Sequence, residues 1–383
     1  MVGFLSPGAA ALHAGADYLG RDRLITLSVD PHASFVFWLK SCAYAAAFVL
    51  TLLLVHRRRR LIWLCVAIVL SGAAQAFYAV LMHLWEIDIN VLGMPIAHSS
   101  QASGAFVNRN HLAGFLELAL AAGIGLMIAQ LDGRSRQRSW RRLLRDTALL
   151  LLSPKAALRL TLVIMVIALV MTRSRMGNSA FFISLLVSGV IGLVLSRYAT
   201  RSMVVLITSL IVVDILVVGT WFGVERTLKR IEETTVQQVE ERVDPSVYAM
   251  QIFHDYPVFG TGGGTFYTAF TRYRGRDIDA YYDHVHNDYV QFLTETGALG
   301  LGLLGLFVLA AFTCAVLAQA RRRDPLARGV AFAVILGTSA LAIHSSVDFN
   351  LQIPANAFLI MIVLAMGWLS LHLVERSNDR RPR

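Results

Sequence analysis

Residues 290–320 read VQFLTETGALGLGLLGLFVLAAFTCAVLAQA, and Glu295 is the one charged side chain between Val290 and Ala320. A helix of about 20 apolar residues crosses the hydrocarbon core of a bilayer, so this stretch predicts a transmembrane span. Eight further apolar segments have comparable length: Ala33 to Val55, Leu61 to His83, His111 to Leu131, Ala156 to Thr172, Asn178 to Ser196, Met203 to Gly223, Gly329 to Val347 and Ala355 to Val374. The sequence therefore predicts an all-α, polytopic transmembrane bundle with about nine spans.

The composition agrees with a membrane protein. Of 383 residues, 56% are hydrophobic and only 16% are charged, which leaves too little polar surface for a water-soluble globule. Basic residues concentrate in alternate loops, and such loops stay in the cytoplasm. The net charge of +10 is therefore expected to reflect topology and contact with anionic lipid, and it does not call for nucleic acid. The basic segments begin at Arg57, Gly133, Arg197 and Arg321 and include the tail after Val374.

This charge distribution predicts which parts of the chain lie outside and how the chain is organised. The segments expected outside are residues 1–32, 84–110, 224–289 and 348–354. Three regions follow: an N-terminal transmembrane region of about six spans (1–223), a large outer loop (224–289) and a C-terminal transmembrane region of about three spans (290–383). The outer loop is too short for an independent domain, so we expect it to pack over the helices as a cap.

The end of the outer loop reads His284-Val-His286-Asn-Asp-Tyr and runs directly into the apolar stretch. If a helix begins at Asp288, Asn287 is its N-cap, and the positive end of the helix dipole favours a neutral imidazole at His286. A neutral imidazole can act as a general base, whereas the alternative is a structural histidine. The helical step places Glu295 opposite His286, so we expect Glu295 to pack or to pair helices.

Several other polar patterns allow two interpretations each. Arg173 and Arg175, in Thr172-Arg-Ser-Arg-Met-Gly, either reach the lipid headgroups or point inward to hold a phosphate. The four glycines within Gly260–Gly264 either bring backbone amides to an anion or form a flexible turn. Arg242 is expected to be a solvated residue of a helix over 225–242.

A second helix is predicted to start at Asp244, with Pro245 in its first position. Carboxylates and imidazoles in the loop also suggest a metal site, against the simpler interpretation of an acidic loop. The candidate ligands are Asp277, Asp279, His254, Asp283, His284 and His286. Two further polar clusters, Asn108-Arg-Asn-His111 and His344-Ser-Ser-Val-Asp348-Phe-Asn350, either line one cavity or cap helices.

Together these motifs resemble the O-antigen ligase and polysaccharide polymerase superfamily of bacterial inner membranes, whose helical fold is similar to that of GT-C glycosyltransferases. The resemblance rests on His286-Asn287, followed after nine residues by Gly297-Ala-Leu-Gly300, and it covers nearly the whole chain. The supporting stretches are Tyr256-Pro-Val-Phe-Gly-Thr-Gly, Ser28-Val-Asp-Pro-His32, Phe106 to Gly114, Thr172 to Gly177 and His344 to Asn350.

The resemblance implies transfer of a glycan from undecaprenyl diphosphate to an acceptor hydroxyl at the periplasmic face, with inversion and without cofactor, metal or nucleotide sugar. By resemblance, His286 is the catalytic residue, and Arg175 and Arg242 bind the lipid diphosphate. Residues that line or support the cavity are expected to be Asn287, Arg109, His111, His344 and Asp348.

Within this family, the acceptor is either lipid A core, as in ligation, or another repeat unit, as in polymerisation. Two other classes stay open: a transporter or flippase of the same lipid-linked glycan, and a noncatalytic scaffold in which His286 is replaceable. The chain departs from the family at Met176 and Asn178, which stand where small residues are usual. Members of the family commonly have more spans, so the resemblance also implies further spans upstream of residue 1.

Overall fold

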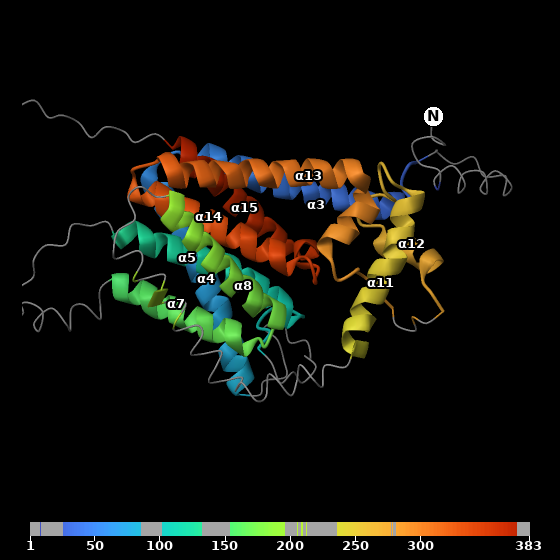
Figure 1. Ribbon diagram of the computed structural model, residues 1–383, viewed down its shortest axis with the longest axis horizontal. Coiled ribbons are helices and arrows are strands. Elements are labelled where there is room, and N and C mark those ends of the chain that lie inside the picture. The colour runs from blue at the N-terminus through green and yellow to red at the C-terminus, as the bar shows by residue number, and fades with distance from the viewer. Residues whose placement is uncertain are drawn as a thin grey trace, which may run out of the picture. The chain divides into compact units, whose positions relative to one another are not determined.

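The structure is a computed structural model, shown in Figure 1. It describes residues 26–85, 102–131, 154–195, 236–276, 278 and 281–373, together with the single positions 8, 205, 208, 209 and 212. The predicted span Met203–Gly223 falls almost entirely outside these residues.

The described chain is all-helical, as predicted, and contains no strand. Eight of its helices are long and apolar enough to cross a membrane, and they match the other eight predicted spans. These eight are α3 (Pro31–Leu54), α4 (Arg58–Leu84), α5 (Arg109–Leu131), α7 (Pro154–Met171), α8 (Arg175–Leu195), α13 (Asp288–Arg321), α14 (Pro325–His344) and α15 (Pro354–His372). The remaining elements are α11 (Val236–Asp255), α12 (Phe266–Tyr273) and the short 3-10 helix η1 (Asn350–Gln352).

The chain divides into two compact units, each assembled from separate stretches of sequence. Unit 1 contains Met1–Ala46, Leu216–Leu309 and Ala342–Ala357. Unit 2 contains Ala47–Ile215, Ala310–Leu341 and Phe358–Arg383.

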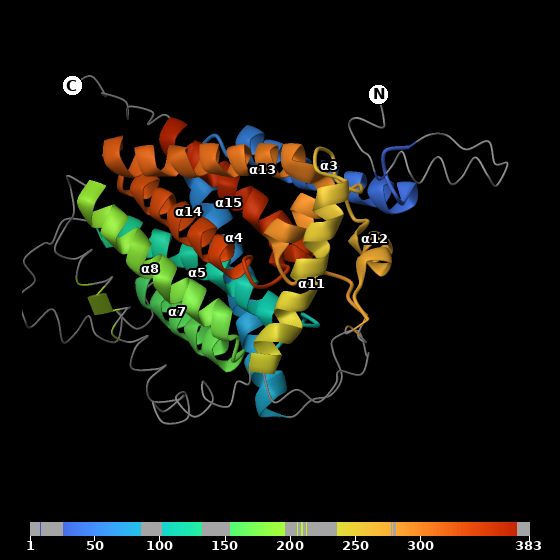
Figure 2. The ribbon, with the colours of Figure 1, turned by 45° about the vertical axis from the view of Figure 1, so that its right-hand side comes forward.

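Unit 2 is a helical bundle built around α5. Helices α4, α5, α7 and α8 lie side by side in both ribbon views (Figures 1 and 2). Small residues allow α5 to approach its neighbours closely: a Cβ on Gly125 would lie 2.4 Å from the Gly329 carbonyl oxygen of α14. Such contacts between small residues are a common way for membrane helices to associate, because lipid provides no hydrophobic drive between them.

Unit 1 contains the outer loop with a small hydrophobic core of its own. Helices α11 and α12 lie side by side (Figures 1 and 2) and bury a cluster of apolar side chains together with the segment that precedes α13. The cluster comprises Ala249, Ile252, Tyr256, Phe266, Ala269, Phe270, Ile278 and Val285. This core fixes the conformation of the segment that precedes α13.

Helix α13 has a break that the hydropathy pattern did not predict. Gly297 adopts φ 67° and ψ −176°, a conformation accessible essentially only to glycine. The amides of Ala298 and Leu299, freed from the helix, donate to the carbonyl oxygens of Pro257 (2.9 Å) and Val258 (3.2 Å). A Cβ at position 297 would lie 2.2 Å from the Val258 carbonyl oxygen. The Gly297-Ala-Leu-Gly300 motif therefore joins the outer loop to α13.

The predicted helix start at Asp244 is wrong. Helix α11 runs without interruption from Val236 to Asp255 and contains Pro245 in its interior. Proline keeps φ near the helical value, so the chain can stay helical even though it loses the N–H hydrogen bond and the ring crowds the carbonyl of residue i−4.

Candidate functional site

His286 lies at the start of α13, and its backbone is unusual. Its φ is 59°, in the left-handed region that non-glycine residues seldom adopt. The next residue, Asn287, accepts hydrogen bonds at Oδ1 from the amides of Tyr289 (3.0 Å) and Val290 (3.2 Å). The prediction of an Asn287 N-cap is thereby confirmed, and His286 lies one residue before this cap.

The turn that follows α14 is fastened to the same helix start. The Asp288 amide donates to the carbonyl oxygens of Ser345 (2.9 Å) and Asp348 (3.2 Å), and Asp288 Oδ2 accepts from the Leu351 amide at 2.9 Å. Asp288 is fully buried. Because its backbone and its carboxylate hold the two ends of the turn, the residues between them are fixed relative to α13.

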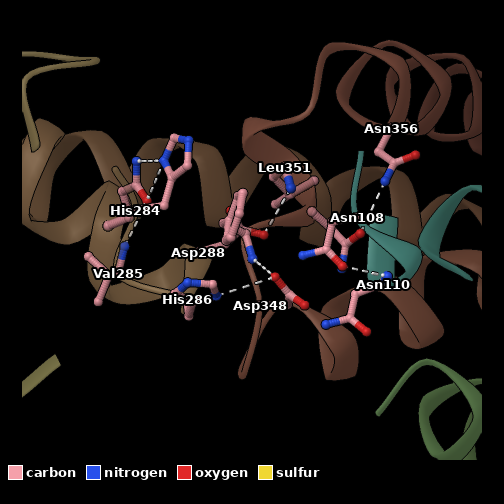
Figure 3. A network of polar contacts seen from close by, with 12 residues as sticks. Asn108, Asn110, His284, Val285, His286, Asp288, Asp348, Leu351 and Asn356 are labelled. Atoms are coloured by element: carbon pink, nitrogen blue, oxygen red, sulfur yellow. Dashed lines mark hydrogen bonds and ion pairs between the residues drawn. The ribbon is translucent and has the colours of Figure 1, made fainter. Parts of the chain in front are cut away.

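These contacts bring Asp348 to His286. In Figure 3 the two side chains point toward one another, and His286 Nδ1 lies 3.8 Å from Asp348 Oδ1. Asp348 is buried and its Oδ1 accepts a hydrogen bond from the Phe349 amide at 2.8 Å, whereas the His286 side chain remains 31% exposed. The distance suits an ion pair and exceeds a hydrogen bond. A buried carboxylate therefore faces an imidazole that remains partly exposed.

Aromatic rings surround His286. Phe349 lies between two histidines: its ring is stacked on His284 at 4.4 Å and meets His286 edge-on at 4.8 Å. Tyr282 meets His286 edge-on from the outer loop, with ring centroids 6.3 Å apart. His284 is held in turn by Gln291, whose side-chain amide nitrogen lies 2.9 Å from its Nδ1. The imidazole of His286 thus has little freedom to rotate.

The glycine-rich loop, Gly260–Gly264, binds the carboxylate of Glu295 from helix α13. Glu295 is buried and accepts hydrogen bonds from the amides of Gly264 (2.8 Å) and Phe266 (3.2 Å) and from Gln291 Nε2 (3.2 Å). Of the two interpretations of Gly260–Gly264, the structure favours a turn, because the Gly264 amide is occupied by this carboxylate and the amides of Gly260, Thr261 and Gly262 donate to backbone carbonyl oxygens.

Glu295 therefore fastens the outer loop to α13 instead of pairing helices. The bound segment lies about thirty residues before Glu295 in the sequence, and backbone amides leave no signature there. The structural roles of Gln291 and Asp288 were not predicted for the same reason. Their partners lie in a loop and in a turn that only the folded chain brings to α13. The available signal was that Gln291 and Glu295 are polar residues in an otherwise apolar stretch and that Asp288 directly precedes it.

The other sequence-predicted residues fall in both units. His344 is buried at the end of α14 in unit 1, in the same segment as Asp348. Arg242 lies in helix α11, and its side chain is outside the described part of the structure. Arg109, His111 and Arg175 belong to unit 2.

In unit 2 two of the predicted polar motifs cap helices. Asn108 Oδ1 accepts from the Asn110 amide at 2.9 Å at the start of α5, next to Arg109 and the buried His111. Ser174 Oγ accepts from the Gly177 amide at 3.1 Å and caps α8. Arg175, the first residue of α8, and Arg173, in the turn before it, both expose their side chains.

The metal interpretation has no support in the described chain. Among the described residues, no group of three or more His, Cys, Asp or Glu side chains is placed to hold a metal ion. Asp277 and Asp279 lie outside the described residues. His284 is engaged with Gln291 and Phe349 instead.

Residues 160–305 match a protein-family model described as O-antigen ligase. This range contains the turn with Arg175, helix α11, the glycine-rich loop, His286 and the break in α13. A comparison with curated proteins gives no match. The family match agrees with the resemblance of the sequence motifs, and Asp348 lies beyond the matched range.

Proposed function

We propose that this chain, a multi-pass membrane protein with an O-antigen ligase family domain, transfers a glycan from undecaprenyl diphosphate to a sugar hydroxyl. The reaction would take place at the periplasmic face of the bacterial inner membrane. One observation supports the proposal above the others: His286, inside the matched range, directly precedes the N-cap of α13 and faces the buried Asp348 at 3.8 Å.

The proposed chemistry is a single displacement. With Nδ1 directed at Asp348, His286 has Nε2 available to accept the proton of the acceptor hydroxyl as its oxygen attacks the anomeric carbon. The new C–O bond forms on one face while the bond to the diphosphate breaks on the other, and undecaprenyl diphosphate leaves with the bonding electron pair. The configuration therefore inverts. The negative charge of Asp348 stabilises the imidazolium that forms.

Arg175 and Arg242 are proposed to bind the departing diphosphate, on the basis of the family resemblance. A guanidinium can hold two phosphate oxygens at once and stabilise the charge that grows as the anomeric bond breaks. Arg175 is exposed at the first position of α8. The resemblance also implies that transfer continues in the presence of EDTA and needs no nucleotide sugar.

The test is the glycan profile of a host that lacks this gene and is complemented with wild type, His286→Asn or His254→Asn. Asparagine tolerates the left-handed conformation of position 286 but cannot act as the base. His254 is an exposed histidine of α11 and serves as the matched control. We expect the His286 variant to reach the membrane at the wild-type level, to accumulate lipid-linked glycan and to lose the transferred product.

The missing product also identifies the acceptor. Loss of long chains indicates polymerisation, whereas loss of glycan-capped lipid A core indicates ligation. A normal profile with His286→Asn contradicts the proposed chemistry. Accumulation of the lipid-linked glycan on the cytoplasmic side instead indicates a flippase.

A further inference from the structure

Two tyrosine rings are exposed beside the loop that leads to His286. Tyr281 is 67% exposed and Tyr267 is 47% exposed, and their ring centroids lie 5.2 Å apart at an interplanar angle of 44°. Single exposed aromatic residues are ordinary, whereas these two rings adjoin one another.

The pair is not part of the hydrophobic core of the outer loop. Helix α12 directs Phe266 and Phe270 into that core, where their rings stack at 4.8 Å. Tyr267, which directly follows Phe266, remains on the outside. The core is already filled without the tyrosine pair, so packing does not explain why both rings are present.

The pair is continuous with the candidate site. Tyr281 contacts Tyr267, and the next residue, Tyr282, contacts both Phe270 (6.4 Å) and His286 (6.3 Å). His286 lies five positions after Tyr281, so their Cα atoms are at most about 18 Å apart. A short oligosaccharide can span such a distance.

The chemistry around the pair suits a neutral sugar. The C–H face of a pyranose packs on an aromatic ring, and its hydroxyl groups hydrogen-bond to carboxylates and phenols at the edge. The interaction with the Tyr281 hydroxyl, together with the nearby Asp283 carboxylate, raises the pKa of Tyr267. The patch therefore combines apolar ring faces with polar edges.

We propose that Tyr267 and Tyr281 form a saccharide-binding platform that holds the acceptor glycan a few sugar units from the hydroxyl presented to His286. The inference rests on the proposed function, because the acceptor is the substrate whose proton His286 accepts. The platform adds binding energy remote from the reacting atoms, so it contributes to acceptor affinity more than to the chemical step.

The experiment measures saccharide binding to the full chain in lipid nanodiscs by saturation-transfer-difference NMR. The probes are two soluble oligosaccharides released by mild acid from the source strain: the core oligosaccharide and the polysaccharide repeat unit. The variants are Tyr267→Ala, Tyr281→Ala and Tyr281→Phe. Trp63→Ala is the matched control, since Trp63 is an exposed aromatic residue of α4.

We expect each alanine variant to weaken binding of one probe about tenfold, because it removes a stacking ring. Tyr281→Phe keeps the ring and should stay within about threefold of wild type, and Trp63→Ala should bind as wild type does. In a transfer assay, Tyr281→Ala should raise the acceptor KM about tenfold and leave kcat within about twofold.

The proposal is overturned if wild type binds neither oligosaccharide, or if the alanine variants bind as tightly as wild type. In that second case the rings serve as an interfacial anchor in the lipid headgroups. His286→Asn separates this test from the proposed function: it should bind saccharide normally and transfer none. If it still transfers, the proposed chemistry fails, while the binding data still decide the platform.

Discussion

His286 occupies a backbone conformation that a β-carbon normally disfavours, at an expense on the order of 1–3 kcal/mol. Its neighbours hold it there: Asn287 caps α13 on one side, and Asp288 fastens the turn that contains Asp348. Strained residues persist where the surrounding structure over-determines them. In this chain the strained backbone of His286 places its imidazole opposite the buried carboxylate of Asp348.

The role of that carboxylate leads to a prediction for Asp348→Asn. An asparagine keeps the volume and can still accept the Phe349 amide, but it has no charge to stabilise the imidazolium. We expect the initial rate of glycan transfer in isolated membranes to fall about tenfold to a hundredfold, with unchanged membrane insertion. A wild-type rate would show that His286 works without Asp348.

At the residue scale, the sequence predicted only what is local. Asn287 as the N-cap could be predicted from its place directly before a helix, and the structure bears it out. The pairing of His286 with Asp348 joins the outer loop to the turn after α14, and periodicity gives no information about such contacts. Both residues were candidates, but their partnership was not predicted.

At the scale of elements, the strongest connection in unit 1 is the Glu295 carboxylate on the glycine-rich loop. Glu295→Gln removes the charge, and the amide can accept from the Gly264 and Phe266 N–H groups only through its one oxygen. We expect a destabilisation of about 2 kcal/mol, because charge-assisted hydrogen bonds to a buried carboxylate are lost. Hydrogen–deuterium exchange should show faster exchange at residues 260–266.

The matched control for that experiment is Thr296→Ser. Thr296 directly follows Glu295, and its hydroxyl donates to the Phe292 carbonyl oxygen within α13, a bond that serine can also make. This control should leave exchange at residues 260–266 unchanged. If Glu295→Gln does the same, the loop is held by its backbone contacts alone.

The start of α3 is expected to respond to acid. The Ala33 amide donates to Asp30 Oδ1 at 3.0 Å and holds the pKa of Asp30 below its ordinary value of 3.8. A lowered folded pKa means that the stabilisation is present above pH 3.8 and is lost as pH falls through the folded pKa. Exchange at the Ala33 amide should therefore accelerate below pH 3.8, relative to the intrinsic rate. Asp30→Asn, which cannot titrate, should show no such step.

The helices of the structure show which elements can be predicted from sequence patterns. Eight predicted spans correspond to helices because hydropathy reports burial in lipid directly. Pro245 led to the wrong prediction of a helix start, because α11 continues through this proline. The break at Gly297 was not predicted, because this glycine lies within the apolar stretch that forms α13. The break depends on the Pro257 and Val258 carbonyl groups of the outer loop, which no local pattern specifies.

At the scale of the whole molecule, the proposed function requires one orientation in the membrane. The basic loops predict that residues 133–153 are cytoplasmic and that the outer loop, with His286, is periplasmic. Alkaline phosphatase is active only after export, and green fluorescent protein fluoresces only in the cytoplasm. We therefore expect fusions after residue 150 to fluoresce without phosphatase activity, and fusions after residue 276 to show phosphatase activity without fluorescence.

The reverse pattern would have a direct consequence for the chemistry. It would place His286 and Asp348 on the cytoplasmic side, where a periplasmic glycan acceptor is absent, and so it would contradict the proposed transfer.

Removing positive charge from one basic loop offers an independent check of the orientation. Replacement of Arg57, Arg58, Arg59 and Arg60 by Asn removes four of the cations that hold this loop in the cytoplasm. This variant should weaken the orientation of the neighbouring spans and lower phosphatase activity in the residue 276 fusion. An unchanged activity would mean that the remaining basic loops are sufficient to orient the chain.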